Sequence, residues 1–211
     1  MKHLSNFGLA GLLLAFGGCV TPEVRYETIH DAASEGKPHD IAALLDEGVS
    51  VNQRGDHGMT PLHSAAAWGS ADIMEYLLSR GADINAVNDW GLTPLHIAAA
   101  RCHEQDVAFL LAHGASVNAI TQAGWTPLHY AAARGDAEEV AQLIDAGGDL
   151  NAVNHTGDTA LHRAARNASD AVVRVLMERG ADKTIKNKNG ETAADAARHE
   201  GHENIAVLLE Q

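Results

Sequence analysis

One tetrapeptide recurs along this chain at a fixed interval. Thr60-Pro61-Leu62-His63 returns unchanged at residues 93–96 and 126–129, and altered copies stand at 159–162 and 192–195. Each interval is 33 residues, with no insertion or deletion between copies. A glycine keeps the same period, at Gly58, Gly91, Gly124, Gly157 and Gly190. A period of this length is typical of stacked units that share one continuous core, not of a single globular core.

Within one unit the pattern predicts two short helices. Thr93 stands where a helix would begin, and Pro94 occupies the first turn, where its missing N–H costs nothing. The apolar residues at helical spacing are Leu95, Ala98, Ala99, Val107, Leu110 and Leu111. Gly114 fits the position just past the end of the second helix. We expect the segment from Asn118 to Trp125 to be a turn that projects as a finger.

The motif, its period and its glycines resemble the ankyrin repeat family over about residues 24–211. The resemblance implies an all-α repeat solenoid of helix-turn-helix units joined by β-turn fingers. Six stacked units are expected, at 24–56, 57–89, 90–122, 123–155, 156–188 and 189–211. Unit one has Glu27-Thr28 in place of Thr-Pro, and unit six lacks the Pro and the His. Such substitutions are expected of terminal units, which need polar outer faces.

The first residues of the chain have the pattern of a targeting signal. A basic start, Met1-Lys2-His3, precedes an apolar, uncharged segment at residues 4–16. This segment is shorter than the roughly 20 residues that span a bilayer, and it matches the apolar region of a signal peptide. The sequence Gly17-Gly18-Cys19 resembles the end of a bacterial lipobox, which predicts a lipoprotein-type signal peptide at 1–18 and acylation of Cys19.

The expected location follows from this signal. Residues 19–23 would be a short tether, so that the array lies close to the membrane. Val20 stands where Asp would favour retention in the inner membrane, so we expect a periplasm-facing protein anchored to the outer membrane. A plain secretory signal, which would give a secreted or soluble periplasmic protein, and an uncleaved anchor are the alternatives.

Composition limits the partners. With 15 basic and 28 acidic residues, the formal charge is −13, so nucleic acid is not an expected partner. The chain is 45% hydrophobic and 20% charged, which argues against a disordered protein. The two cysteines cannot make a disulfide framework. We expect a monomer that reaches the membrane only through its lipid anchor.

Thirteen histidines suggest a metal site, but five of them follow the repeat. These are His30, His63, His96, His129 and His162. The family resemblance implies that this histidine binds the motif threonine and a backbone group of the next unit. Packed helices lie about 10 Å apart, whereas zinc ligands must converge to about 2.0–2.1 Å from one ion. We therefore expect no metal and no cofactor.

Cys102 is the unusual residue of the repeat. It occupies a turn position where four of the other five units have glycine and one has Ala168, so a positive φ with mild strain is expected. His103 and Glu104 follow it, and a Cys-based redox enzyme or a His-based metal protein is a remote alternative function. No third orienting group is evident, and the sequence has no phosphate-binding loop or nucleophile elbow. We predict no enzymatic activity.

The ankyrin resemblance implies a protein-binding scaffold, whose concave surface is made of finger tips and exposed faces of the first helices. A membrane-tethered example would bind and position, or inhibit, a soluble partner. A periplasmic immunity or inhibitor protein is one alternative, and an accessory factor of oxidative-stress defence is another.

The resemblance also predicts where the partner binds, because family members vary finger tips and two residues late in the first helix. These positions include Met59, Asp89, Trp90, Leu92 and Trp125 on the fingers and Trp68, Arg101 and Arg134 on the helices. Trp and Arg are enriched among binding hot spots. We predict an aromatic and basic groove across units two to four for a protein with acidic and apolar groups. Alternatively, each tryptophan merely covers a neighbouring finger.

Overall fold

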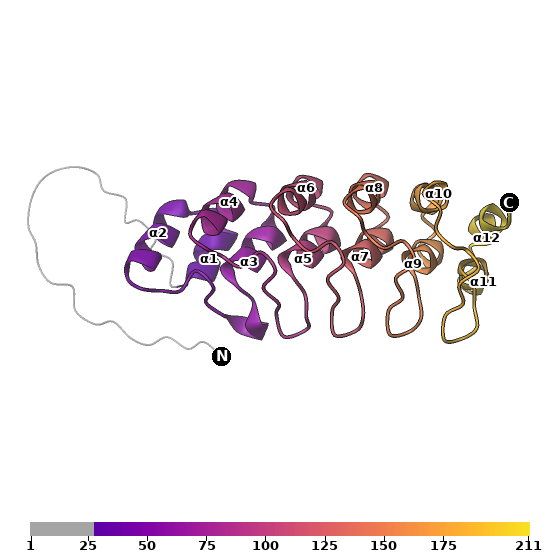
Figure 1. The fold of residues 1–211 in the computed structure, drawn as a ribbon, viewed down its shortest axis with the longest axis horizontal. Helices are drawn as coiled ribbons and strands as arrows, with labels where there is room; N and C mark the ends of the chain where they lie inside the picture. Colours follow the sequence, from indigo (N-terminus) through magenta and orange to yellow (C-terminus); the bar gives the residue numbers. More distant parts are fainter. Residues whose placement is uncertain (1–27) are drawn as a thin grey trace, which may run out of the picture.

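The computed structural model describes residues 28–211, and it shows six helical pairs stacked in a row (Figure 1). The described residues contain no strand. The first, inner helices are α1 (Ile29–Ser34), α3 (Pro61–Trp68), α5 (Pro94–Arg101), α7 (Pro127–Arg134), α9 (Ala160–Arg166) and α11 (Ala193–His199). The second, outer helices are α2 (Pro38–Asp46), α4 (Ala71–Ser79), α6 (Glu104–Ala112), α8 (Ala137–Asp145), α10 (Asp170–Glu178) and α12 (Glu203–Glu210). The predicted all-α repeat solenoid is confirmed.

The connecting segments form fingers that project on one side of the inner helices (Figure 1). The first finger contains a single turn of 3-10 helix, η1 (Asp56–Gly58). The predicted signal peptide at 1–18, the predicted lipidation site Cys19 and the predicted tether at 19–23 lie outside the described residues.

The repeat motif begins each inner helix as expected. Thr93 has an extended backbone, its side chain accepts a hydrogen bond from the His96 N–H, and Pro94 occupies the first turn. Thr60, Thr126 and Thr159 also begin their helices with a capping box, in which the motif histidine accepts from the threonine N–H, and proline follows the first two but alanine follows Thr159. The motif therefore fixes the same helix start in four consecutive units.

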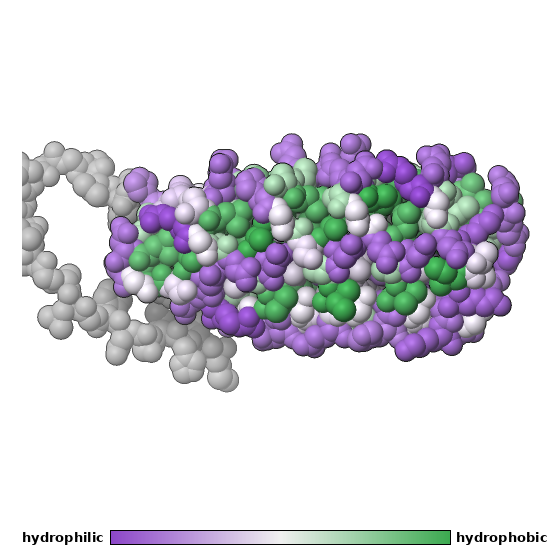
Figure 2. All heavy atoms as spheres, viewed as in Figure 1, coloured by the Kyte–Doolittle hydropathy of each residue, from purple (hydrophilic) through white to green (hydrophobic). Residues whose placement is uncertain are grey.

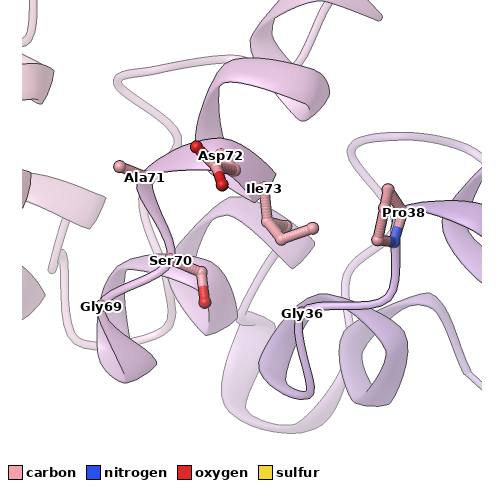
Figure 3. A pocket seen from close by; sticks show the side chains of 7 residues that line it. All are labelled: Gly36, Pro38, Gly69, Ser70, Ala71, Asp72 and Ile73. Carbon is pink, nitrogen blue, oxygen red and sulfur yellow. The ribbon is translucent and has the colours of Figure 1, made fainter.

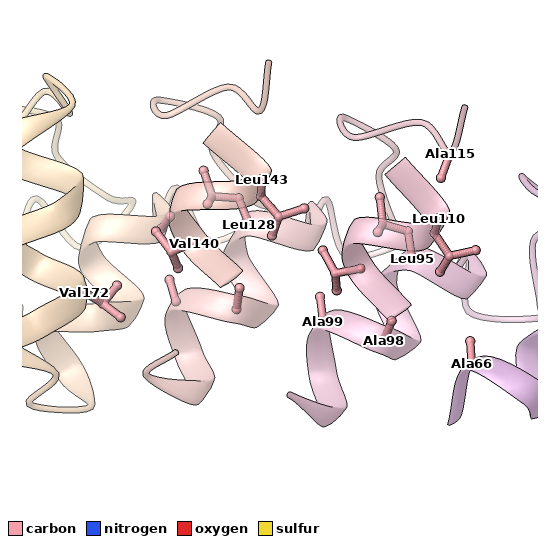
Figure 4. Packing of buried hydrophobic residues seen from close by; sticks show 14 of the residues in the cluster. Ala66, Leu95, Ala98, Ala99, Leu110, Ala115, Leu128, Val140, Leu143 and Val172 are labelled. Atoms are coloured by element: carbon pink, nitrogen blue, oxygen red, sulfur yellow. The ribbon is translucent and has the colours of Figure 1, made fainter. Parts of the chain in front are cut away.

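The core is one continuous layer between the two rows of helices (Figure 4). The motif leucines, Leu62, Leu95, Leu128 and Leu161, are all buried. Each is followed by a pair of buried alanines, such as Ala98 and Ala99, which allow the inner helices of neighbouring units to approach closely. Because a unit packs mainly on its neighbours, stability is a sum of interfaces along the row.

The motif histidine joins each unit to the next. In unit three, the Nδ1 atom of His96 accepts a hydrogen bond from the Thr93 N–H at 3.1 Å, and its Nε2 atom donates to the Trp125 carbonyl at 3.1 Å. Corresponding Nε2 bonds run from His63 to Leu92, from His129 to Asp158 and from His162 to Glu191. This geometry needs a neutral imidazole with its proton on Nε2. The expected structural role of the repeated histidines is confirmed.

Three of these histidines, His63, His96 and His129, make stability depend on pH. Burial lowers the pKa of His96 to about 4 and also lowers the pKa values of His63 and His129. In the unfolded chain a histidine has a pKa of about 6.5, so the unfolded state binds protons first as the pH falls. The stability that the neutral imidazoles contribute is fully present above pH 6.5 and is lost as the pH falls toward 4.

We predict that His96→Gln makes this loss smaller. Gln can still accept the hydrogen bond at the helix start but does not titrate. Between pH 6.5 and 4.5, the free energy of unfolding measured in urea should fall by about 2 kcal/mol less in the variant than in the wild type. Substituting the exposed His155 by Gln is the control and should leave the pH dependence unchanged. Parallel pH profiles for His96→Gln and the wild type would contradict the prediction.

The turn between the two helices has a left-handed residue in every unit. Cys102 has φ 59° and Ala168 has φ 54°, whereas the other four units have glycine there. The expected strain at Cys102 is therefore confirmed, because a side chain at positive φ is unfavourable.

We predict that Cys102→Gly raises the free energy of unfolding by about 1 kcal/mol, because it relieves this strain. The matched opposite change is Gly201→Ala, at φ 82° in the last unit, where a Cβ atom would meet nothing within 4 Å. It should lower stability by a similar amount through strain alone. Thermal and urea unfolding of both variants would test the pair, and a loss of stability in Cys102→Gly would show that the thiol makes a compensating contact.

Candidate protein-binding face

The finger tips form a hydrogen-bonded row. The Asp89 N–H donates to the His57 carbonyl at 3.0 Å, and the Gln122 N–H donates to the Trp90 carbonyl at 2.9 Å. Two further bonds of this kind join the later fingers. Gly91 is required in this row, because a Cβ atom at this residue would lie 2.9 Å from the Gln122 nitrogen. Neighbouring fingers are thus fixed relative to one another, and side chains on them have defined positions.

Two rows of equivalent positions change character along the array. We call the first the finger row, and it contains Met59, Leu92, Trp125, Asp158 and Glu191. We call the second the helix-end row, and it contains Trp68, Arg101, Arg134, Asn167 and Glu200. Both rows are apolar or basic in units two to four and end in acidic residues. The finger side therefore has two chemically distinct halves.

In units two to four this surface is open. Trp68, at the end of α3, is 67% exposed, and Trp90, on the second finger, is 49% exposed. Arg101 and Arg134 lie in the last turns of α5 and α7, and both are exposed. Among the ion pairs within residues 28–211, none involves either arginine. Two guanidinium groups are thus available to a partner.

The three tryptophans differ in their contacts. Trp90 stacks on His57, with 4.8 Å between ring centroids, and otherwise faces solvent. Trp125 is only half-exposed, because the Arg163 guanidinium lies 4.5 Å from its ring centroid and the Tyr130 ring lies 5.0 Å away. Trp68 and Trp90 therefore present free aromatic surface, whereas Trp125 also supports the scaffold.

The other predicted positions lie on the same side of the array. Met59 and Leu92 are half-buried, and the Leu92 carbonyl accepts the His63 hydrogen bond. Asp89 forms an ion pair with Arg54 at 2.9 Å, and Arg54 also donates to the Val87 carbonyl. Asp89 therefore braces the first two fingers against each other.

In units five and six the charged residues of the two rows are paired within the protein. The buried Asp158 lies 3.8 Å from Arg166, which in turn pairs with Glu191 at 2.9 Å and with Glu200 at 3.4 Å. Asn187 donates to Asp158 and to Glu191, and its hydrogen bond is the main reason that the pKa of Glu191 lies below its usual value. The acidic residues that end the two rows therefore already have partners within the protein.

A hollow extends the open half toward unit one. Its volume is about 440 Å³, and it lies between the first finger and the inner helices α1 and α3. Its lining includes His30, Asp31, His57, Met59 and Ser64. The accessible surface thus reaches one unit further than the predicted groove across units two to four.

The sequence-based prediction missed a second set of exposed residues on the fingers. Val87, Ile120 and Val153 occupy the same repeat position and are 49%, 64% and 52% exposed. Figure 2 shows separate apolar patches at regular spacing along the finger half of the molecule. The sequence signal that could have identified them is the recurrence of a β-branched residue at this one position in three consecutive, otherwise mainly polar segments. We call the set of Met59, Trp68, Val87, Trp90, Leu92, Arg101, Ile120, Trp125, Arg134 and Val153 the candidate face.

Cys102 and His103 lie beside Asp106 at the turn before α6. Both line a pocket of about 290 Å³ beside α6, but the His103 imidazole is directed to the Ala67 carbonyl, at 3.4 Å. In the part of the chain that the structure describes, no three His, Cys, Asp or Glu side chains gather where they could hold a metal ion. None of the helices in residues 28–211 has the length and apolar character needed to cross a bilayer.

Stacked helical pairs, hydrogen-bonded fingers and an exposed face of fixed geometry define the class of repeat scaffold proteins. A family model described as ankyrin repeats (3 copies) matches residues 6–88, 29–121, 81–153, 107–187 and 128–211. The chain belongs to the ankyrin repeat family, and such repeats are protein-interaction scaffolds. No curated protein matches the chain.

Proposed function

We propose that this protein is a non-catalytic scaffold, anchored in the bacterial envelope by a lipid on Cys19, that binds a partner protein through the candidate face. The main support is the contrast between the two halves of the finger side. Arg101 and Arg134 have no ion-pair partner among the described residues, whereas Arg166 has two close carboxylates. Unpaired guanidinium groups beside exposed aromatic rings are typical of interface hot spots.

The chemistry of the face indicates the kind of partner. Exposed apolar side chains at regular spacing require apolar groups opposite them. The two arginines require carboxylates, and both lie in an otherwise acidic molecule of charge −13 that repels most other acidic surfaces. We therefore infer a partner whose contact surface combines apolar and acidic side chains but whose overall charge is not strongly negative.

The rigid arrangement of the face favours binding. The finger tips are held to one another by backbone hydrogen bonds, and the inner helices are held by the buried core. Little ordering is then needed on association, so more of the contact energy is retained as affinity.

We predict that Trp68→Ala and Trp90→Ala each weaken partner binding about 30-fold, which corresponds to about 2 kcal/mol at a hot spot. A partner captured from an envelope extract and then purified would be titrated calorimetrically with each variant. Both variants should unfold like the wild type, because both rings are exposed. Trp125→Ala should lose stability as well as affinity, because Arg163 and Tyr130 pack on this ring.

The matched control is Val207→Ala, which removes an exposed apolar side chain from the last unit, away from the candidate face. It should leave the affinity unchanged. If the double variant of Trp68 and Trp90 binds as tightly as the wild type, the partner binds elsewhere on the array.

The anchor is tested independently of the partner. We predict that a fatty-acid analogue labels the wild type in growing bacteria and does not label Cys19→Ala, because the acyl chains would be attached to this thiol. Cys102→Ala is the control and should be labelled like the wild type, since it retains Cys19. Equal labelling of wild type and Cys19→Ala would rule out lipidation at Cys19.

A further inference from the structure

In units two to six, the third residue of the outer helix lies at the interface with the preceding unit. In unit two this residue is Ile73, which is buried and extends toward Pro38 of unit one (Figure 3). In units five and six the equivalent residues are Val172 and Ile205, and both are fully buried. An apolar side chain at this position closes the gap between two units without leaving a polar group unsatisfied.

Units three and four have carboxyl groups at this position instead. Asp106 is 3% exposed and Glu139 is 0% exposed. Within the described chain, one oxygen of Asp106 and both carboxyl oxygens of Glu139 have no hydrogen-bond partner. A buried carboxylate without a partner is unfavourable, and the protonated form is favoured instead.

The groups that face Glu139 are predominantly acidic. Asp136 begins its own helix, α8, and Glu104 begins the packed helix α6 and accepts a hydrogen bond from Gln142 of α8. Among the described residues, Arg134 is the one cation whose charge acts on Glu139, and it is exposed at the end of α7. The charges of α10, on the other side, are occupied elsewhere: Arg174 pairs with Asp170, and Arg179 pairs with Asp145.

We propose that the interface between units three and four is a proton-controlled joint, which is closed while Glu139 keeps its proton and loosens when the proton is lost. This inference is independent of any partner. It rests on a buried, unsatisfied carboxyl group at a position that is apolar in three other units.

The charges around Glu139 determine the pH range over which stability changes and whether stability rises or falls with pH. Burial, and then the charges of Asp136 and Glu104, raise the pKa of Glu139 to about 8. The folded state therefore holds a proton that the unfolded state has already lost above about pH 4.5. The stability associated with this proton is fully present below pH 4.5 and is lost as the pH rises through 8. This effect is opposite in sign to that of the motif histidines, which act on the acidic side.

Protonation of Asp106 affects stability in the same direction, at the neighbouring interface between units two and three. Its pKa is raised by burial, and the charge of His103 opposes the change. The effect is concentrated at Glu139, because both of its oxygens lack a partner.

The two units that meet at this joint also carry part of the candidate face. Arg101 ends the inner helix of unit three, and Arg134 ends that of unit four. Loosening between these units would change the distance between the two guanidinium groups. Deprotonation of Glu139 would therefore change the shape that a partner meets.

The experiment is hydrogen exchange on the full-length protein between pH 6.5 and 8.5, comparing wild type with Glu139→Gln at each pH. Comparison at equal pH cancels the intrinsic pH dependence of amide exchange. We compare the opening equilibrium constant of the amides in α6 and α8 in the wild type with that in the variant at the same pH. The ratio of the two constants should increase about tenfold per pH unit up to pH 8. Glu138→Gln, one residue earlier and exposed, is the control and should behave like the wild type.

A second variant keeps the test decisive if Glu139→Gln folds poorly. Glu139→Val introduces the residue that unit five has at this position, and it should keep α6 and α8 closed across the whole range. The proposal is wrong if wild type and Glu139→Val show the same pH dependence in these helices. It is also wrong if the pH-dependent opening is confined to the terminal units.

Discussion

The hydrogen bond from each motif histidine to a carbonyl of the next unit is the interaction on which the array depends. It joins residues 29 positions apart, and it is repeated with nearly the same length in successive units. The same imidazole accepts a hydrogen bond from the backbone that begins its own helix. One side chain thus fixes both the start of a helix and the position of the next finger. A candidate face that crosses several units can be rigid only because this link is repeated.

Much of the fold could be predicted from the sequence because the units repeat one sequence pattern with few changes. The alanine pair recurs in all six units, the turn glycine in four and the Thr-Pro pair in three, so the same structure is indicated several times over. Even the departures were informative, since Cys102 and Ala168 in a glycine position implied the positive φ that both adopt.

The candidate site was predictable only in part. The alignment of the repeats placed Trp68, Trp90, Arg101 and Arg134 at variable positions. It could not show that Arg163 and Tyr130 cover Trp125. Nor could it show that Asp158 and Glu191 neutralise Arg166, because those contacts join different units and depend on side-chain conformation. The buried carboxyl groups were visible in register, as Asp106 and Glu139 in place of Ile73 and Val172. Recognising that they lack partners required the packed structure.

The stacking of units in a single row also determines how the protein would respond to mechanical load. A pull along the row acts on every inter-unit interface in series, so extension begins at the weakest interface and not throughout the molecule at once. A protein held at one end in the envelope and loaded by a partner further along would then behave as two stiff rods with a compliant element between them. With the buried carboxyl of Glu139 at the boundary between units three and four, that element would lie near the middle of the array, and its compliance would increase with pH.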